Sequence, residues 1–198
     1  DGRLYGRGAA DMKGGIAAFV AAAARVLETG TGGSISLMIT GDEEGDAVNG
    51  TVKMVEWAAA NGQQPDACIV GEPTGMRVAT GHKGKTAVEA TCIGAEAHSA
   101  LAPTAVNAIH LACDLIAGIR TIQDGLAADG TQDHAYDVPY TTLHAGLING
   151  GVALNIVPNA AFVKFEIRNL PADDPDAILT QLEASLEPVV AAARQRAP

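Results

Sequence analysis

Two apolar segments that end in acidic residues constrain the fold of this chain more than any other feature. Residues 34–39 alternate large apolar and smaller side chains and run into Thr40-Gly41-Asp42-Glu43-Glu44, and residues 67–70 run into Gly71-Glu72-Pro73. These patterns predict two buried strands. Ligands bind at the carboxyl ends of strands in open α/β sheets, so these acids mark a candidate site. Adjacent side chains at a strand end point to opposite sides, so the two neighbouring glutamates can do different jobs.

A glycine-rich stretch with one acid, Asp11, precedes the first of these segments. Residues 16–28 follow it as a predicted alanine-rich helix, and residues 51–60 form a second helix with Val52 and Trp57 expected in the core. Helices that alternate with strands in this way predict a doubly wound α/β domain. Two simpler explanations stay open, namely Asp11 as the N-cap of the helix and the acidic triplet as a solvated turn.

The pattern changes from residue 82 onward. The expected elements are a strand at 86–93, a helix at 104–123, a loop at 124–137, strands at 140–148 and 160–167, and a helix at 176–196. This order, β-α-β-β-α, is that of a ferredoxin-like domain without its last strand. We therefore predict an α/β protein with two domains, residues 1–82 and residues 83–198.

The net charge, hydropathy and cysteine content restrict which partners and compartment we expect for this chain. The net charge of −10 argues against nucleic acid, and no apolar run reaches the length of a membrane span. The three cysteines, Cys68, Cys92 and Cys113, are widely spaced in apolar runs. They predict buried thiols in a reducing compartment, which we expect to be the cytoplasm.

Four acids fall on loops beside the predicted parallel strands: Asp11, Glu43, Glu44 and Glu72. Carboxylates crowded at one site repel each other unless a divalent cation neutralises them. Oxygen ligands together with histidine suit zinc, and two such ions about 3.5–4 Å apart would activate a bridging water. The spacing therefore predicts a metal-dependent hydrolase.

Six motifs stand in order along the chain: GRGAADMKGG, GDEEGDAVNGT, CIVGEPT, HKGK, EAHSALAP and GGVALNIVPNA. Together they resemble the dinuclear-zinc amidohydrolases and metallopeptidases. That family includes acetylornithine deacetylases, succinyl-diaminopimelate desuccinylases, aminoacylases and glutamate carboxypeptidases. The resemblance implies a zinc-peptidase-like catalytic domain, partial here, over residues 1–82, and a lid and dimerisation domain over residues 83–198.

The resemblance also implies roles for the acids. Asp11 matches the carboxylate that bridges two divalent ions, zinc or cobalt as a substitute, and a cis peptide often follows it in the family. Glu43 matches the general base that deprotonates the bridging water. Glu44 matches a ligand of one ion, and Glu72 matches a ligand of the other.

Three lid residues match family positions. His98 matches a histidine that reaches the scissile carbonyl of the partner subunit in a homodimer and donates to its oxyanion. Asn155 and Arg168 match positions that bind the substrate carboxylate. Alternatives stay open: His98 as an ordinary loop histidine, Asn155 as a cap of the turn at 150–151, and Arg168 as a partner of Glu166 or Asp173.

The implied activity is hydrolysis of an N-acyl amide of an amino acid, a small molecule. Residues 41–57 are most similar to the desuccinylases, whereas the longer lid half resembles the acetylornithine deacetylases, so deacetylation of N-acetylornithine is expected. A dipeptidase and a metal-free binding module are the remaining alternatives. The family also needs one histidine upstream of Asp11 and one after the lid. We therefore expect this chain to be an inactive fragment of a longer enzyme.

Overall fold

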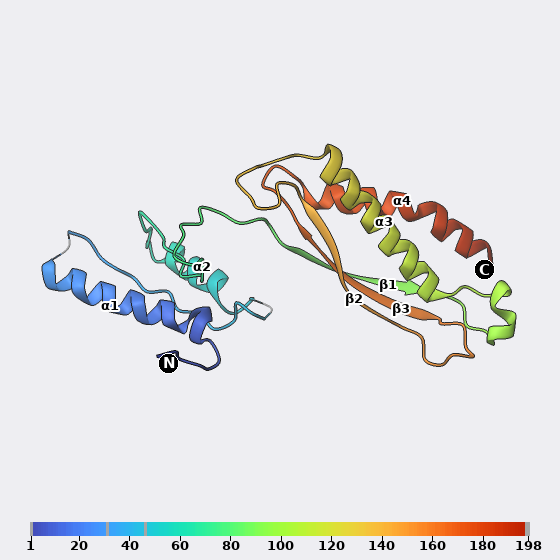
Figure 1. Cartoon of the computed structure of the whole chain (residues 1–198), viewed down its shortest axis with the longest axis horizontal. Coiled ribbons are helices and arrows are strands. Elements are labelled where there is room, and N and C mark those ends of the chain that lie inside the picture. The colour runs from blue at the N-terminus through green and yellow to red at the C-terminus, as the bar shows by residue number, and fades with distance from the viewer. Residues whose placement is uncertain (1, 31, 46, 197–198) are drawn as a thin grey trace. The chain divides into compact units, whose positions relative to one another are not determined.

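The computed structural model describes residues 2–30, 32–45 and 47–196, which form two compact units, Asp1–Ala79 and Thr80–Pro198 (Figure 1). The first unit contains η1 (Ala9–Lys13), α1 (Gly14–Thr29) and α2 (Thr51–Ala60). The second contains β1 (Thr86–Ile93), η2 (Ser99–Thr104), α3 (Ala108–Asp129), β2 (Thr142–Gly150), β3 (Ala160–Arg168) and α4 (Pro175–Arg196). The predicted α/β class and the β-α-β-β-α order of the second half are confirmed.

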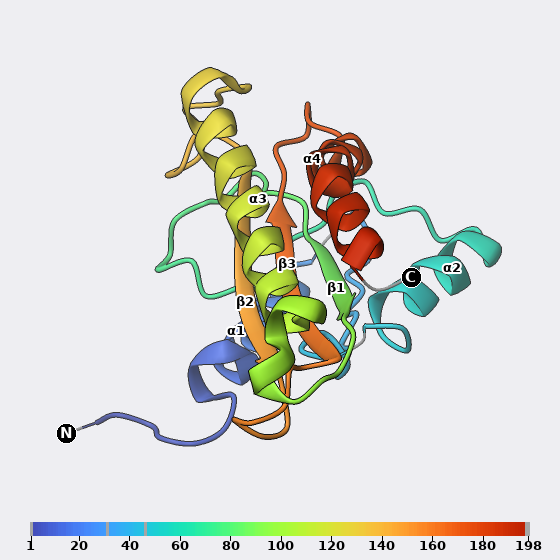
Figure 2. The same cartoon turned by 90° about the vertical axis from the view of Figure 1, so that its right-hand side faces the viewer.

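The second unit is built on a three-stranded antiparallel sheet in the order β1-β3-β2. Thr86 pairs with Ile167 at one end of β3, and Ile93 pairs with Ala160 at the other. The helices α3 and α4 pack on the same face of the sheet (Figure 2). The opposite face carries no helix among the described residues of this unit.

The core lies between that sheet and its two helices. Alternate residues of β3 face the helices, because successive side chains of a strand point to opposite faces. The buried residues of α3 recur every three or four positions and form one apolar stripe. The main core residues are Ala161, Val163, Phe165 and Ile167 of β3, Ala108, Ala112, Leu115, Ile119 and Ile122 of α3, and Ile178 and Leu182 of α4.

The helix expected at 104–123 begins and ends later than predicted. Asn107 is its N-cap, and its Oδ1 accepts hydrogen bonds from the amides of Ile109 at 2.9 Å and His110 at 3.2 Å. The residues from Ser99 to Thr104 form the separate short helix η2 instead. At the other end α3 continues to Asp129, so the loop expected from residue 124 starts after that residue.

One polar side chain of the second unit is fully buried. The Thr141 hydroxyl donates to Oδ2 of Asp173 and accepts from the amide of Leu170 at 2.9 Å. The bonds tie the start of β2 to the segment between β3 and α4. They also satisfy polar groups that would otherwise be buried without a partner.

The strand β2 lies at one edge of the sheet, with a β-bulge between Ala145 and Leu147. Near its start, the outward amide of Leu143 donates to Oε1 of Gln123 on α3 at 2.6 Å. Beyond the bulge, Leu147 and Ile148 are exposed. The edge is therefore covered at one end and open at the other.

The strands expected at 34–39 and 67–70 form no ladder with any described residue. Ile69 and Val70 are 79% and 73% exposed, so the predicted burial is wrong. An extended segment needs a neighbouring strand to bond its backbone and cover its side chains, and the described part of this unit supplies none. For the same reason Val52 and Trp57 of α2 are exposed instead of forming a core.

Two of the three predicted buried thiols are exposed. Cys68 lies in one of the unpaired extended segments, and Cys113 lies off the buried stripe of α3. Cys92 on β1 is partly buried, and this burial raises the pKa of its thiol. None of the described helices is apolar over a length that could cross a bilayer. The cytoplasmic location stays a prediction.

Candidate functional site

Asp11 lies where the backbone changes direction before α1. Its φ and ψ of −120° and 100° are not helical, and the peptide bond to Met12 is cis, as the family resemblance implied. The N-cap position of α1 is Lys13, and no side chain caps this helix by a hydrogen bond. The helix-capping explanation of Asp11 is therefore wrong, and its carboxylate is exposed to solvent.

The acidic triplet divides into one acid with a structural role and two exposed acids. Oδ2 of Asp42 accepts from the amide of Asn49 at 2.8 Å, and its carbonyl accepts from Ala47 at 3.1 Å. Asp42 thus shapes the loop, a role that the sequence pattern did not predict. Glu43 and Glu44 lie in the resulting turn and are exposed.

The segment before Glu72 packs against the start of α1. A Cβ on Gly15 would lie 3.0 Å from the carbonyl oxygen of Gly71. A Cβ on Gly71 would lie 2.6 Å from Cε of Met12 and 2.7 Å from a ring carbon of Phe19. The two glycines therefore allow the chain next to Asp11 to contact the chain next to Glu72.

The predicted metal ligands do not assemble into a metal centre in the described part of the chain. There, no three His, Cys, Asp or Glu side chains come close enough to share an ion. Asp11, Glu44 and Glu72 are hard oxygen donors of the right chemistry. All three are exposed. Their metal-binding roles stay predictions.

His98 and Asn155, in contrast, are brought side by side. Residue 98 forms an antiparallel bridge with Ile156, and the amide of Ser99 donates to the carbonyl of Asn155 at 2.9 Å. The amide of Gly151 donates to the carbonyl of Ala160 at 3.4 Å, and within the described part of the chain the side chain of Asn155 makes no hydrogen bond to that turn. The alternative structural role for Asn155 is therefore wrong.

A hydrogen bond to the backbone determines which nitrogen of the His98 imidazole carries the proton. Its Nδ1 accepts a hydrogen bond from the amide of Ala100 at 3.2 Å. An accepting nitrogen carries no proton, so the proton of the neutral ring is on Nε2. The ring is exposed, and Nε2–H is free to donate to a ligand.

Glycine is required where the His98 loop leaves β1. A Cβ on Gly94 would collide with the carbonyl oxygen of Val106 and would lie 2.8 Å from that of Pro158. The amide of Gly94 also donates to Asn159 at 2.8 Å. Three backbone segments thus meet at this position and fix the loop that carries His98.

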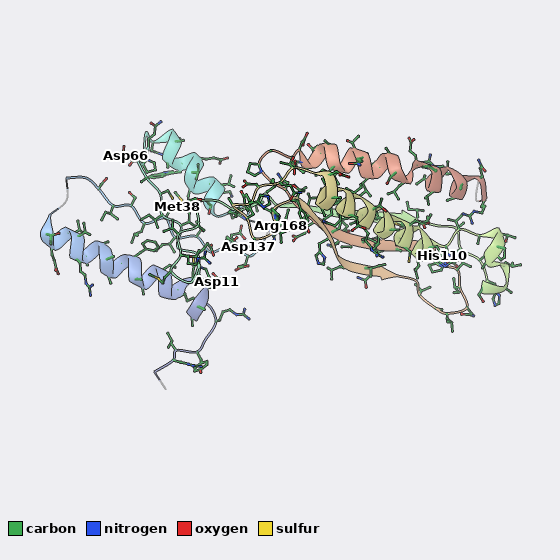
Figure 3. All side chains as sticks on the ribbon, turned by 45° about the horizontal axis from the view of Figure 1, so that its top comes forward. Asp11, Met38, Asp66, His110, Asp137 and Arg168 are labelled. Carbon is green, nitrogen blue, oxygen red and sulfur yellow. The ribbon has the colours of Figure 1, made fainter. Side chains whose placement is uncertain are left out.

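Arg168 lies at the opposite end of the sheet from His98 and Asn155. It pairs with Thr142, whereas the His98 loop follows the pairing of Ile93 with Ala160. The length of β3 separates the two ends by about 26 Å. In Figure 3, Arg168 is labelled at one end of the second unit, and His110, in the first turn of α3, is labelled toward the other. Arg168 and Asn155 of one copy therefore do not contact the same carboxylate, and their shared substrate-binding role stays a prediction that requires one of them to come from a second copy.

A pocket of about 440 Å³ lies beside Arg168 in the second unit. It is lined by Gly81, His82, Lys83, Tyr136, Asp137, Val138, Thr142 and Arg168. The Lys83 ammonium donates to the carbonyl oxygen of Tyr140, and burial lowers its pKa. Of the alternative partners weighed for Arg168, Glu166 is the one found, at 3.0 Å.

A sequence profile described as the peptidase dimerisation domain of the M20 group matches residues 80–193, more than half of the chain. The chain belongs to the M20 dimerisation-domain family. This M20 chain is 40% identical over 196 residues to a succinyl-diaminopimelate desuccinylase of Rhodospirillum centenum. The alignment covers 96% of the chain and 49% of that relative, so the M20 chain spans about half the length of the curated relative.

Solved structures similar to the M20 chain include an aminobenzoyl-glutamate utilization protein of Klebsiella pneumoniae and a tripeptidase of Staphylococcus aureus. The first has 18% identity and a TM-score of 0.45, over 57% of the M20 chain and 26% of the other. The second has 24% identity and a TM-score of 0.38, over 55% and 26%. The family resemblance of the motifs is confirmed by the profile match over residues 80–193 together with the 40%-identical desuccinylase.

Proposed function

We propose that the protein that carries this chain hydrolyses the amide bond of an N-acyl amino acid. The observation that carries the proposal is the exposed Nε2–H donor of His98, fixed beside Asn155 within a peptidase dimerisation domain. Such a donor suits an acyl oxygen that gains negative charge during attack by water. N-succinyl-diaminopimelate is the proposed substrate, because the 40%-identical relative is named for its desuccinylation.

The pocket beside Arg168 supports a substrate that carries several carboxylates. Arg168, Lys83 and His82 line it together with one carboxylate, that of Asp137. The motifs of the lid half favoured N-acetylornithine, which has one carboxylate and needs fewer cationic partners. The similarity to a desuccinylase and the presence of Arg168 and Lys83 in this pocket support the succinylated substrate, so N-acetylornithine becomes the comparison substrate.

The proposed chemistry uses three side chains. The Glu43 carboxylate accepts a proton from water as the water oxygen bonds to the acyl carbon, and His98 of the partner subunit in the proposed homodimer donates to the acyl oxygen. When the tetrahedral intermediate collapses, the C–N bond breaks and Glu43 passes the proton to the leaving amine. Arg168 binds a substrate carboxylate through paired N–H groups.

We further propose that Asp11, Glu44 and Glu72 are ligands of two divalent ions, with zinc as the metal and cobalt as a substitute. Because these side chains do not converge within the described residues, the steps above are assigned to Glu43, His98 and Arg168 alone. Metal analysis of the purified full-length protein tests this part. Fewer than one equivalent of bound metal after expression in zinc would argue against it.

A homodimer is the proposed assembly, in keeping with the family of this domain. The open end of β2, with Leu147 and Ile148 exposed, is the proposed contact surface, since an unpaired edge strand can accept a second strand. Sedimentation of the full-length protein tests the oligomeric state. Substitution of both Leu147 and Ile148 by charged residues should yield a monomer.

A side-by-side assay tests the activity. We expect full-length protein to cleave N-succinyl-diaminopimelate with a kcat/KM at least about tenfold above that for N-acetylornithine. The reverse order would mean that the lid motifs had reported the substrate correctly. A protein that cleaves neither compound and binds no metal would instead be the non-catalytic binding module.

A further inference from the structure

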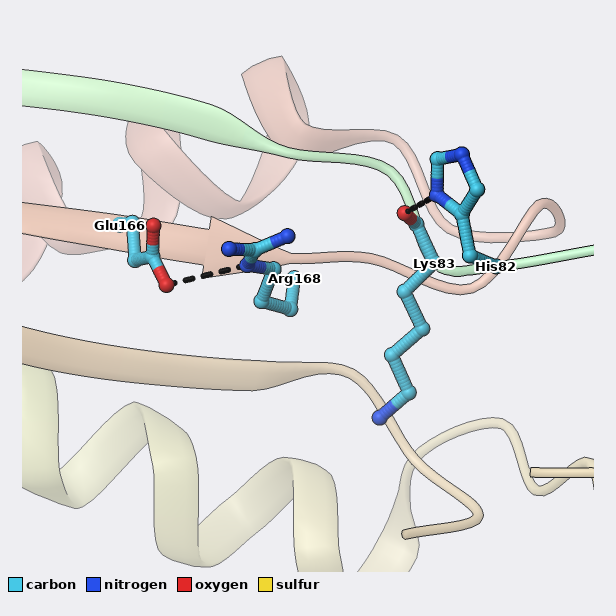
Figure 4. A network of polar contacts seen from close by, with 4 residues as sticks. All are labelled: His82, Lys83, Glu166 and Arg168. Atoms are coloured by element: carbon cyan, nitrogen blue, oxygen red, sulfur yellow. Dashed lines mark hydrogen bonds and ion pairs between the residues drawn. The ribbon is translucent and has the colours of Figure 1, made fainter. Parts of the chain in front are cut away.

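The face of the sheet opposite α3 and α4 carries two ion pairs with different geometry. Lys164 on β3 pairs with Glu89 on β1 across the strands, at 2.7 Å, with side chains 59% and 54% exposed. Arg168 pairs with Glu166 along β3 itself, with Nε of Arg168 3.0 Å from Oε1 of Glu166 (Figure 4). Only the second pair adjoins the pocket of Lys83 and Arg168.

The bond to Glu166 uses one edge of the Arg168 guanidinium. An arginine offers five N–H donors in a planar fork, and a carboxylate can bind either the Nε edge or the edge formed by the two Nη groups. Within the described part of the chain, Glu166 is the hydrogen-bonding partner of this guanidinium, through Nε. The Nε edge is therefore occupied, and the Nη edge remains for a ligand.

The neighbouring cation, Lys83, is a point charge without a planar fork, so it cannot make the paired contact that Arg168 can make with a carboxylate. The Lys83 ammonium donates to the carbonyl of Tyr140 and lies 6.0 Å from the centroid of the Tyr140 ring. His82 Nδ1 lies 2.7 Å from the carbonyl of Lys83 and donates to it (Figure 4). The Nη edge of Arg168 is thus the part of the pocket best suited to a bidentate contact with an anion.

We propose that Glu166 is a positioning residue, which holds the guanidinium of Arg168 so that its two Nη groups bind a carboxylate of the substrate in this pocket. The inference rests on the proposed N-acyl amino acid hydrolase function. Without Glu166, the guanidinium of Arg168 can rotate and turn its Nε edge toward the pocket. A smaller fraction of the protein then has the two Nη groups placed to bind the substrate carboxylate. The effect is on substrate binding and not on bond breaking, because Glu166 does not touch the substrate.

The test compares Glu166→Ala, Glu166→Gln and Glu89→Gln in full-length protein. With N-succinyl-diaminopimelate, we expect Glu166→Ala to raise KM about tenfold and to change kcat less than about twofold. Glu166→Gln keeps an oxygen that can accept from Nε and should show a smaller rise. Glu89→Gln breaks the matched ion pair on the same face and should leave both parameters unchanged.

A substrate analogue with the bound carboxylate replaced by a primary amide completes the test. Each substrate carboxylate is replaced in turn by an amide. For the analogue that lacks the carboxylate bound by Arg168, wild type and Glu166→Ala should have the same KM. If Glu166→Ala behaves like Glu89→Gln, lowers kcat alone, or raises KM equally for the substrate and every analogue, the positioning role is rejected.

Calorimetric titration of N-succinyl-diaminopimelate into metal-stripped protein separates this inference from the proposed activity. A binding constant weakened about tenfold by Glu166→Ala, but not by Glu89→Gln, would support the positioning role even if wild type hydrolysed no N-acyl amino acid. Hydrolysis with equal binding by all variants would reject the role and leave the proposed activity intact. Absence of both binding and hydrolysis in wild type would reject both.

Discussion

The backbone amide of Ser99 donates a hydrogen bond to the carbonyl oxygen of Asn155 over 2.9 Å. The amide of Val157 donates to the carbonyl of Ala97 over 2.8 Å, so two loops far apart in the sequence form a short antiparallel pair. A displacement of either loop therefore moves both His98 and Asn155. Stability of this pair and activity of the protein are expected to depend on the same contacts.

Gly94→Ala should lower the free energy of unfolding by about 3 kcal/mol, because the added methyl group would collide with backbone carbonyls of Val106 and Pro158. Urea unfolding followed by circular dichroism measures the effect. Gly125→Ala is the matched control, since a Cβ at this α3 position meets no described atom within 4 Å. It should stabilise the chain by about 0.5–1 kcal/mol. Equal effects of the two variants would contradict the close approach at Gly94.

Thr141→Val should cost about 2–3 kcal/mol, because it removes the hydroxyl that bonds both the amide of Leu170 and Asp173 in a buried position. Thermal unfolding monitored by calorimetry checks this. Thr91→Val makes the same change at an exposed position of β1 and should stay within about 0.5 kcal/mol of wild type. A loss at Thr141 no larger than that at Thr91 would mean that the network contributes little.

Glu43 and Glu44 should differ in phenotype although they are neighbours. In full-length protein, Glu43→Gln should keep its bound metal and lose kcat by about 10²–10⁴, the usual scale for loss of a general base. Glu44→Gln should lower metal occupancy instead. Metal content by plasma mass spectrometry, together with kcat, tests both. Zinc lost from the Glu43 variant and kept by the Glu44 variant would reverse the two roles.

His98→Ala in full-length protein should reduce kcat by about 10²–10³ with a small change in KM, as expected for loss of an oxyanion donor. Steady-state kinetics measure this. His134→Ala, at an exposed loop position, serves as the control and should be close to wild type. A variant at His98 with normal kcat would make it an ordinary loop histidine.

Alkylation by iodoacetamide at neutral pH should modify Cys68 and Cys113 before Cys92. The two former thiols are exposed, whereas burial raises the pKa of Cys92 and leaves less of its reactive thiolate at a given pH. Peptide mapping by mass spectrometry gives the order of modification. Raising the pH should narrow the difference, because the thiolate fraction of Cys92 then increases. Faster labelling of Cys92 at neutral pH would contradict its partial burial.

The second unit could be predicted well because its elements supply each other's partners. The alternation from Thr86 to Ile93 predicted β1 with its observed bounds, since those residues pack against helices of the same unit. The start of α3 lies later than predicted because Asn107 is its N-cap and Thr104 ends the separate helix η2. Periodicity predicts that a helix exists more reliably than where it begins.

The first unit and the site could be predicted only in part. Apolar patterns at residues 34–39 and 67–70 indicate what a strand would bury, but no strand pairs with them among the described residues. The sequence motifs identified Arg168 and Asn155 as candidate site residues. Their positions near opposite ends of β3 follow only from the register of the sheet. The structural use of Asp42 was hidden for a similar reason, because its partner Asn49 is identified by the loop conformation and not by composition.

The hydrogen bond from Leu143 to Gln123 sets a stop for strand addition at β2. In the proposed dimer, a strand of a second copy added along this edge would find no free backbone donor at Leu143, because that amide already donates to Gln123. The added strand of the proposed dimer would therefore pair with the part of β2 after Leu143, which contains the bulge between Ala145 and Leu147. A side chain of α3 would thus limit how far a second copy can extend along this edge, whereas a fully bare edge would set no such limit.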